Sequence, residues 1–305
     1  MSQENTYDLV IIGGGPAGSA AAVYAARKKI KSAILTPEFG GQSVVSDDIQ
    51  NWIGTPHISG YDLGKSLEKH VKEYQGDILN VVKGYVASVE KNNDQTFTIK
   101  TSKDVIMTAK AVLVTTGSVR RKLDAKNADV FEHKGVTYCA SCDGPVFANK
   151  NVVVIGGGNA AFESALQLAA YCTKVYLLNR TDSYRADEIT VDKVKKNDKI
   201  EIINNAVVDE VLGDKFVNGL VYNHGIRLDV EGIFVEIGQM PNTSYINFVD
   251  KNSAGNIVVD PRTQKTSVEG VWAAGDCTDG LYHQNNIAVG DAVKALESLY
   301  IWLQG

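Results

Sequence analysis

The sequence predicts an α/β protein made of two similar units, each built around a parallel β-sheet. Residues 7–35 contain a β-rich apolar run, a G-x-G-x-x-G turn, an Ala-rich helical stretch and a second apolar run. The same order returns over residues 151–178, with G-x-G-x-x-A at the turn. Strand, glycine turn, helix and strand in this order are typical of a βαβ unit that binds a dinucleotide. We therefore predict two Rossmann-like dinucleotide-binding domains, each with a central parallel sheet and an added β-meander layer.

The glycines of the first turn each have an expected role. Gly13 permits a tight turn, Gly15 lets the backbone approach a pyrophosphate, and Gly18 lets the helix pack closely on the strand. The helix N-terminus then faces the phosphates. The predicted elements are a strand over residues 7–12, a helix over 19–27 and a strand over 31–35.

A carboxylate is expected near the end of the second strand, where a dinucleotide ribose is held. Glu38 is the first carboxylate there, and it is either this ribose ligand or a solvated loop residue. The run Gly40-Gly41-Gln42 marks another close approach of the backbone. Further along we predict a helix over residues 62–74, meander strands over 85–89, 96–101 and 105–108, and a buried strand over 111–115 that ends at Thr116-Gly117.

The second unit is predicted from a strand over residues 151–155, a helix over 162–170 and a strand over 174–178. No carboxylate stands where the 2′-hydroxyl of NAD would need one at the end of its second strand. Arg180 and Arg185 stand there instead and can pair with a 2′-phosphate, which favours NADPH over NADH. The alternative is that they are two exposed surface arginines. A further strand is expected over residues 232–238.

The C-terminal part contains a third place where the backbone can come close to a ligand. A strand over residues 270–274 ends at Gly275 and Asp276, which offers a carboxylate to a hydroxyl such as that of a flavin ribityl chain. The last helix is predicted over about residues 285–303, with an N-terminus that favours an anionic reduced flavin ring. Its predicted apolar stripe consists of Val289, Val293, Leu296, Tyr300 and Leu303.

Between the two units lies a pair of cysteines, Cys139 and Cys142, followed by Asp143. Two thiols three positions apart can cycle between dithiol and disulfide, and at a helix start their pKa is depressed. Pro145 fits only the first turn of such a helix. A zinc site is the alternative, but it needs further soft ligands, and Cys172 and Cys277 form no second CxxC. We expect no metal.

Composition limits the other possibilities. The chain has 305 residues, 44% of them hydrophobic, and a net charge of −5, so nucleic acid is not an expected partner. No run approaches the ~18 apolar residues of a membrane span, and the start carries no basic region of a signal peptide. Four cysteines are too few for a secreted disulfide framework. We expect a cytoplasmic protein with no membrane association.

These motifs together resemble the low-molecular-weight thioredoxin reductase family, class II of the pyridine nucleotide-disulfide oxidoreductases, along essentially the full length. The CxxCD between two nucleotide motifs is the discriminating feature. The family commonly has Arg or Lys where this chain has His283, and His-Arg-Arg where it has Asn179-Arg180-Thr181. The carrying motifs are Gly13–Gly18, Gly40–Gln42, Cys139–Asp143, Gly156–Ala161, Ala273–Asp276 and Tyr282–Gln284.

The resemblance implies an FAD-binding domain made of residues 1–117 and 244–305. An NADPH-binding domain over residues 118–243, which carries the CxxC, is inserted between them. It also implies a homodimer, and a rotation of the inserted domain about hinges near 117–118 and 241–243. Electrons would pass from NADPH through FAD and the Cys139–Cys142 disulfide to thioredoxin. Cys142 would lie against the flavin, Cys139 would attack the partner, and Asp143 would act as acid and base.

The expected site residues follow from the motifs and this resemblance. The FAD ligands are expected to be Gly13, Gly15, Pro16, Ala17, Gly18, Glu38, Gly41, Gln42, Asn51, Thr116, Gly117, Gly275, Asp276, His283, Gln284 and Asn285. The NADPH ligands are expected to be Gly156, Gly158, Asn159, Ala160, Ala161, Asn179, Arg180, Arg185 and Gly238.

Alternatives stay open at this point. Residues 38–42 and 70–74 also resemble the flavoproteins of alkyl hydroperoxide reductase, which carry an extra N-terminal thioredoxin-like domain for which 305 residues leave no room. A glutaredoxin-like protein or a peroxiredoxin partner is compatible as acceptor, and NADH or ferredoxin as donor. A non-enzymatic alternative is a nucleotide-sensing flavoprotein, but such a sensor needs no redox pair.

Overall fold

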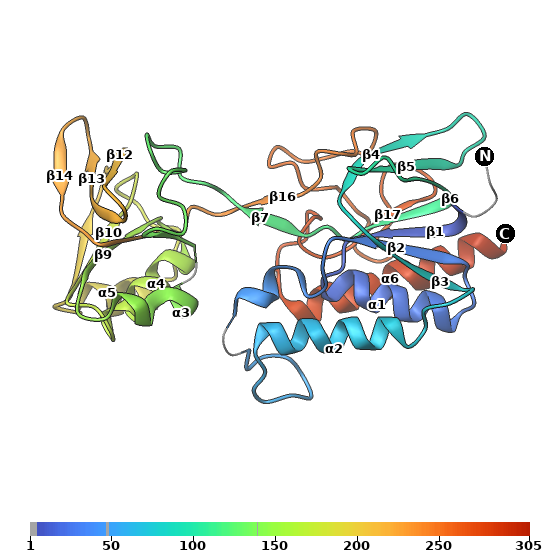
Figure 1. Ribbon diagram of the computed structural model, residues 1–305, viewed down its shortest axis with the longest axis horizontal. Coiled ribbons are helices and arrows are strands. Elements are labelled where there is room, and N and C mark those ends of the chain that lie inside the picture. Colours follow the sequence, from blue (N-terminus) through green and yellow to red (C-terminus); the bar gives the residue numbers. More distant parts are fainter. Residues whose placement is uncertain (1–4, 47–48, 139) are drawn as a thin grey trace. The chain divides into compact units, whose positions relative to one another are not determined.

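The computed structural model describes residues 5–46, 49–138 and 140–305, and the chain divides into two compact units (Figure 1). Unit 1 comprises Met1–Val119 and Met240–Gly305, and unit 2 comprises Arg120–Gln239. The two segments that cross between them, β7 (Ser118–Arg120) and β16 (Gln239–Pro241), pair with each other. The boundaries predicted from the sequence are 117/118 and 243/244. Which cofactor each unit binds stays a prediction.

Unit 1 is built on one sheet with the strand order β3-β2-β1-β6-β5-β4, to which β17 is added beside β6. The strands β3, β2, β1, β6 and β17 run parallel, so their carboxyl ends meet at one edge. That edge is where an open α/β sheet binds ligands. The bounds are β1 Thr6–Ile12, β2 Ser32–Thr36, β3 Leu79–Lys83, β4 Val86–Lys91, β5 Phe97–Thr101, β6 Ile106–Val114 and β17 Val271–Ala273.

Strand β6 corrects one prediction. The sequence predicts two strands, 105–108 and 111–115, but β6 is a single strand. Its first half pairs with β5, from Ile106 to Ala109, and its second half pairs with β1 and β17. The same strand therefore belongs to the meander β4-β5-β6 and to the parallel sheet. The local sequence pattern does not reveal one continuous strand, because each half of β6 pairs with different neighbouring strands.

The helices of unit 1 are α1 (Pro16–Arg27), α2 (Gly60–Lys72) and α6 (Asn285–Gln304), with the short 3₁₀ helix η2 at Gly41–Val45. They lie on one side of the sheet in Figure 1. Leu9 and Ile11 of β1 face α1 and α6, whereas Tyr7, Val10 and Ile12 face the meander and the segment that contains Ile246.

The buried face of α6 differs from the predicted stripe. Its buried residues are Ala288, Ala292, Ala295, Leu299 and the predicted Leu296, whereas Val289 and Val293 are only partly buried. The prediction follows large apolar side chains and therefore misses the alanines. Small residues on α6 and on the Ala-rich α1 pack in one cluster, and this lets the two helices approach closely.

Unit 2 repeats the architecture. Its five strands run parallel in the order β11-β10-β9-β15-β8. Helices α3, α4 and α5 pack on one face through Val152 and Val154, and a three-stranded antiparallel meander packs on the other through Val153 and Ile155. The bounds are β8 Val136–Thr137, α3 Ala140–Asp143, η3 Gly144–Phe147, β9 Asn151–Ile155, α4 Asn159–Ala169, β10 Lys174–Leu178, α5 Glu188–Lys195, β11 Ile200–Ile203, β12 Val208–Gly213, β13 Val217–Tyr222, β14 Ile226–Leu228 and β15 Gly232–Val235.

The predicted fold class is therefore confirmed: both units have a parallel sheet, helices on one face and an added meander. Within the residues described, none of the helices has both the length and the apolar character needed to cross a bilayer.

Candidate functional site

In unit 1, the turn between β1 and α1 requires glycine at its first and last positions for packing reasons. Gly13 has a φ of +116°, in the region that L side chains rarely adopt. A Cβ on Gly18 would lie 1.8 Å from the carbonyl oxygen of Gly13. These two glycines bring the first turn of α1 against the end of β1, as the motif predicts.

Gly15 is different, because nothing in the protein demands glycine there. It is the N-cap of α1 with φ −70° and ψ −172°, which any residue can adopt, and no side chain caps the helix. The nearest atom to a Cβ at this position would be the Cα of Gly41, at 3.9 Å. Pro16 and Ala17, the next two residues, are buried and add no long side chain at the start of the helix. A helix N-terminus that is uncapped and free of side-chain bulk fits the pyrophosphate of a dinucleotide.

The segment after β2 folds back over this turn. The Thr36 hydroxyl donates to the carbonyl oxygen of Glu38, and the N–H of Gly40 donates to the carbonyl oxygen of Gly14. These bonds hold the exposed Glu38 beside the turn, where the prediction places a ribose ligand. Gly41, with a φ of +57°, comes opposite Gly15.

The start of α6 is joined to Ser43 and Asn51 by hydrogen bonds. Asn51 donates to Gln284 at 2.9 Å, and Asn286 donates to the carbonyl oxygen of Asn51 at 2.6 Å. Ser43 donates to Asn285 at 2.9 Å. The structure thus brings together three of the predicted residues, Asn51, Gln284 and Asn285. Ser43 and Asn286 were not predicted, and no motif identifies them.

The ends of β6 and β17 complete this edge. The Thr116 hydroxyl donates to the carbonyl oxygen of Asn242 and lies 3.0 Å from the Tyr245 hydroxyl. A Cβ on Gly275, which has a φ of +77°, would touch Ala288 of α6 and Ala17 of α1. The chain therefore reaches Asp276 between the starts of both helices.

Four predicted residues, Gln42, Gly117, Asp276 and His283, also lie near this edge. Burial raises the pKa of the Asp276 carboxyl, and the charge of His283 acts in the opposite direction. Gln42 donates to the carbonyl oxygen of Ser118, close to Gly117, which has a φ of +60°. The residues predicted to bind the first dinucleotide thus come from the carboxyl ends of the strands, the N-termini of two helices and the segments beside them.

In the turn of unit 2, too, the first glycine is required by backbone conformation and packing, whereas the middle glycine is not. Gly156 has a φ of +154°, and its Cβ would lie 2.2 Å from the carbonyl oxygen of Glu236. Gly158, the N-cap of α4, has a φ of −105° and a ψ of 179°, and nothing lies within 4 Å of a Cβ placed there. Ala161 takes the place of the third glycine and is fully buried. An open, uncapped helix start beside Ala160 again fits a phosphate group.

The loop after β10 is shaped by Asn179. Its buried amide donates to the carbonyl oxygens of Thr181 and Ser183, at 2.8 and 2.9 Å. The N–H of Arg185 donates to the carbonyl oxygen of Gly157 at 2.8 Å, which folds the loop onto the glycine turn. Arg180 and Arg185 are exposed, and within the described chain no ion pair involves either guanidinium. Both guanidinium groups therefore lie in the loop after β10, where the sequence predicts that they bind a 2′-phosphate.

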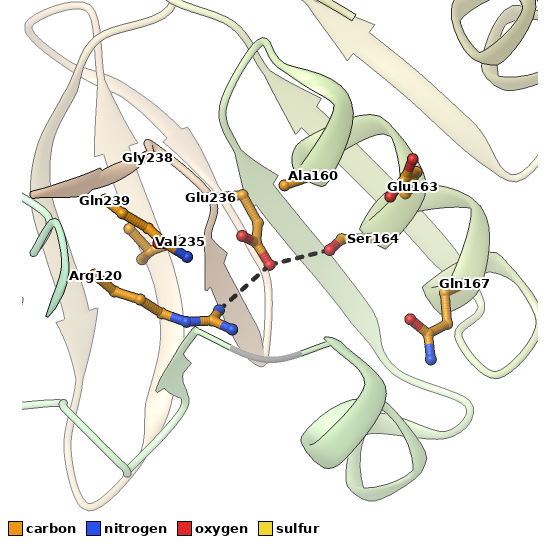
Figure 2. Close-up of a pocket in the computed structure, with 9 residues that line it drawn as sticks. All are labelled: Arg120, Ala160, Glu163, Ser164, Gln167, Val235, Glu236, Gly238 and Gln239. Atoms are coloured by element: carbon orange, nitrogen blue, oxygen red, sulfur yellow. Dashed lines mark hydrogen bonds and ion pairs between the residues drawn. The ribbon is translucent and has the colours of Figure 1, made fainter. Parts of the chain in front are cut away.

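Asn159 makes protein contacts with both ends of its amide. It donates to the Asp187 carboxylate at 2.9 Å and accepts from the Asp187 N–H at 2.7 Å, which joins the starts of α4 and α5. Gly238, with a φ of +98°, lines a pocket of about 260 Å³ together with Ala160 (Figure 2).

The cysteine motif is only partly described. Cys139 lies outside the described residues, and Cys142 lies within α3. Asp143, the last residue of α3, accepts a hydrogen bond from Thr137 of β8, a partner that the sequence did not indicate. Pro145 corrects the prediction that it belongs to the first turn of the CxxC helix. Pro145 lies in the separate 3₁₀ helix η3, which begins at Gly144, because a proline inside α3 would break that helix.

The other two cysteines are buried in different units. Cys172 donates to the carbonyl oxygen of Phe147, and burial raises its pKa. Burial also raises the pKa of Cys277 to about 12. Both thiols are protonated near neutral pH, as expected for small buried side chains. Within the described part of the chain, no three His, Cys, Asp or Glu side chains are grouped so as to hold a metal ion.

Comparisons with known proteins agree with this architecture. The family model for pyridine nucleotide-disulphide oxidoreductases matches residues 7–292. The F subunit of alkyl hydroperoxide reductase from Escherichia coli (strain K12) is 39% identical over 313 residues, which cover 99% of this chain and 59% of that protein. A Bacillus subtilis (strain 168) protein named NADH dehydrogenase is 35% identical over 309 residues, which cover 99% of this chain and 60% of that protein. The chain thus spans about three fifths of the length of these relatives.

A solved structure matches along both chains. The crystal structure of Lactococcus lactis thioredoxin reductase in its FR conformation gives a TM-score of 0.84 at 32% identity, and covers 98% of this chain and 99% of that one. The resemblance to low-molecular-weight thioredoxin reductases that the motifs indicated is confirmed. The chain belongs to the pyridine nucleotide-disulphide oxidoreductase family.

Proposed function

We propose that this chain is a flavin-dependent disulfide reductase that takes electrons from NADPH and delivers them through Cys139 and Cys142 to the disulfide of thioredoxin. The observation that carries the proposal is the pair of open helix starts. Gly15 and Gly158 are glycines that neither backbone geometry nor packing requires, in two units of one chain that also holds a CxxCD. Two dinucleotides and a redox-active dithiol are the parts of such an enzyme.

Family membership implies FAD and a pyridine nucleotide. In unit 1 the uncapped N-terminus of α1 would hold the FAD pyrophosphate, Glu38 the adenosine ribose, and Asp276 a ribityl hydroxyl. In unit 2 the N-terminus of α4 would hold the nicotinamide dinucleotide. When bound, the flavin supplies two-electron transfer between a nicotinamide and a disulfide.

The dithiol chemistry follows from the residues of the motif. The Cys139 thiolate attacks a disulfide of the partner, which forms a mixed disulfide and releases one partner sulfur that takes up a proton. Cys142 then attacks the mixed disulfide, which restores the Cys139–Cys142 bond and releases the second partner thiol. Two electrons and two protons leave the dithiol and reach the partner. Asp143, which accepts a hydrogen bond from Thr137, would accept and return a proton during these steps.

The preference for NADPH rests on Arg180 and Arg185. Replacing both by Ala should weaken NADPH use, measured as kcat/KM, by about 10- to 100-fold, because charged hydrogen bonds to the 2′-phosphate are lost. NADH use should change little. Arg227→Ala is the matched control, since Arg227 is exposed in the same unit and pairs with Asp229. The name of one relative, NADH dehydrogenase, points to NADH as the alternative donor. A wild-type protein that uses NADH better than NADPH would exclude NADPH as the preferred donor.

The crossing segments are where we place the hinges of a rotation of unit 2. Gly117 precedes β7 and Gly238 precedes β16; both have a positive φ, and no atom lies within 4 Å of a Cβ at either position. Such positions change backbone conformation at little steric cost. Small-angle scattering of the oxidised and the dithionite-reduced protein tests this proposal, and identical profiles would argue against it.

We also propose that the protein is a homodimer, and analytical ultracentrifugation checks this by its sedimentation.

The decisive experiment is anaerobic titration of the FAD-loaded protein with NADPH or NADH, followed by a purified acceptor. Thioredoxin is the first acceptor to test. A peroxiredoxin-type component is the second, because the F subunit of alkyl hydroperoxide reductase is 39% identical to this chain. Thiol release from thioredoxin supports the proposal, and release only from the peroxide-reducing component would replace thioredoxin as the acceptor.

A Cys142→Ser variant separates a reductase from a nucleotide-sensing flavoprotein. Flavin reduction by the nicotinamide should remain, whereas thiol release from the acceptor should fall to background. Cys172→Ala is the control for loss of a cysteine in the same unit, because that thiol is buried and donates to the carbonyl oxygen of Phe147. If Cys142→Ser retained full acceptor reduction, the motif would not carry the chemistry.

A further inference from the structure

The pocket of Figure 2 contains a partly buried carboxylate that no part of the mechanism above uses. Glu236 follows β15, and its backbone adjoins the glycine turn: its N–H donates to the carbonyl oxygen of Ile155. The side chain is only 13% exposed. One oxygen, Oε1, accepts from the Ser164 hydroxyl at 3.0 Å and lies 3.8 Å from the Arg120 guanidinium (Figure 2).

Within the described residues, the side-chain hydrogen bond and the ion pair of Glu236 both involve Oε1, and neither uses the other oxygen, Oε2. It belongs to a residue that lines the pocket. Two more side chains carry charge there, Arg120 and Glu163. The lining thus holds one cation and two carboxylates, so the pocket has a net negative charge when all three are ionised.

The position of the pocket in the sheet indicates which part of a ligand it receives. Strands β10 and β15 lie on opposite sides of β9, so the chain order reverses at β9, where the glycine turn begins. A dinucleotide bound at this turn spans both sides. The exposed Arg180 and Arg185 follow β10 and suit the adenosine end with its 2′-phosphate. The nicotinamide end then points over β15, toward Glu236.

Keeping this carboxylate ionised is costly. Burial raises the pKa of Glu236, and the charge of Glu163 adds to this effect, while Arg120 and Ser164 oppose it. A Gln side chain would fill the same space without the charge. A carboxyl kept where its ionisation costs stability indicates a role in binding.

We propose that Glu236 is a specificity-determining residue that makes this site favour the oxidised, cationic nicotinamide ring over the neutral reduced ring. Loss of a hydride leaves a positive charge on the ring, and a carboxylate in a shielded pocket attracts that charge more strongly than one in water. The proposal rests on the proposed function only for the identity of the ligand.

Calorimetric titration of the FAD-loaded protein tests it with two ligands. One is the oxidised dinucleotide that the wild type binds best. The other is its 1,4,5,6-tetrahydro analogue, whose ring is neutral and donates no hydride. Glu236→Gln should weaken binding of the oxidised ligand by about tenfold and binding of the analogue by less than about twofold. Glu236→Asp keeps the charge and should retain the wild-type ratio.

Glu231→Gln is the matched control, because Glu231 is exposed and immediately precedes β15, at the end away from the pocket. It should leave both affinities unchanged. Equal loss of both ligands in Glu236→Gln, or no loss of either, would overturn the proposal. Failure of any nicotinamide dinucleotide to bind the wild type would instead reject the proposed function. Circular dichroism and thermal unfolding of each variant show whether unit 2 is folded.

Discussion

The two glycine turns have nearly the same sequence but differ at the last position of the motif. In unit 1 a Cβ at the last position, Gly18, would lie 1.8 Å from a backbone oxygen. In unit 2 the same position is Ala161, whose Cβ is accommodated in the core. Helix α1 is therefore held closer to its strand than α4. The last glycine of the motif is thus a packing requirement that only one unit has.

The middle glycine teaches the opposite lesson. Gly15 and Gly158 have ordinary backbone angles and open surroundings, so in both units the protein alone would accept a side chain there. By contrast, α2 begins with a conventional cap, because the Ser59 hydroxyl accepts from the N–H of Asp62. Helices α1 and α4 lack such a cap, and this keeps their N-terminal N–H groups available for a ligand.

The largest expected effect comes from exchanging the residue types at the last position of the two glycine motifs. Gly18→Ala should destabilise unit 1 by about 3 kcal/mol and abolish FAD retention, because the new Cβ overlaps backbone that cannot move away. Ala161→Gly should cost only about 1 kcal/mol in unit 2, from loss of helix propensity and a small void. Denaturant unfolding and the flavin absorbance of the purified protein measure both. Equal costs would show that the two turns pack alike.

A smaller effect is expected at the middle position. Gly158→Ser adds a side chain where nothing lies within 4 Å, so the free energy of unfolding should change by no more than a few tenths of a kcal/mol. Binding of a nicotinamide dinucleotide should weaken by about tenfold, since the hydroxyl caps the N–H groups that the phosphate needs. Titration calorimetry checks the affinity. Unchanged binding would mean that the phosphates lie elsewhere.

The smallest effect concerns the pH dependence of stability. Each unit has a carboxyl with a pKa that burial raises, Asp276 in unit 1 and Glu236 in unit 2. A raised pKa means that the folded state holds the proton more tightly than the unfolded state. The stability contributed by Glu236 is therefore present below its unfolded pKa and is lost as the pH rises through its folded pKa.

Glu236→Gln should therefore unfold at the same or a slightly higher temperature than the wild type near pH 8, with a gain of at most about 1 kcal/mol. The difference should close as the pH falls toward about 4, where the native carboxyl is protonated. Thermal scans across this range measure it. A variant less stable at pH 8 would show that the contact with Arg120 outweighs the burial of the charge.

Local pattern was enough to place many elements. Strands β9 and β10 have the predicted bounds, 151–155 and 174–178, and α6 begins at the predicted Asn285. Apolar runs between glycine turns mark such strands clearly. The pattern failed at β6, where two partners share one strand, and on α6, where alanines form the buried face. Both failures concern the neighbours of a segment, which local sequence does not specify.

The sequence by itself determined the order of strand, turn and helix in both units, because glycine, proline and apolar spacing act over a few residues. It also marked the open positions Gly15 and Gly158 and the arginines after β10. Only the tertiary structure placed Arg120, Ser164 and Glu236 around one pocket, since they come from three separate elements. The burial that raises the pKa of Glu236 exists only once the sheet has formed. Contacts between distant segments have no local signature.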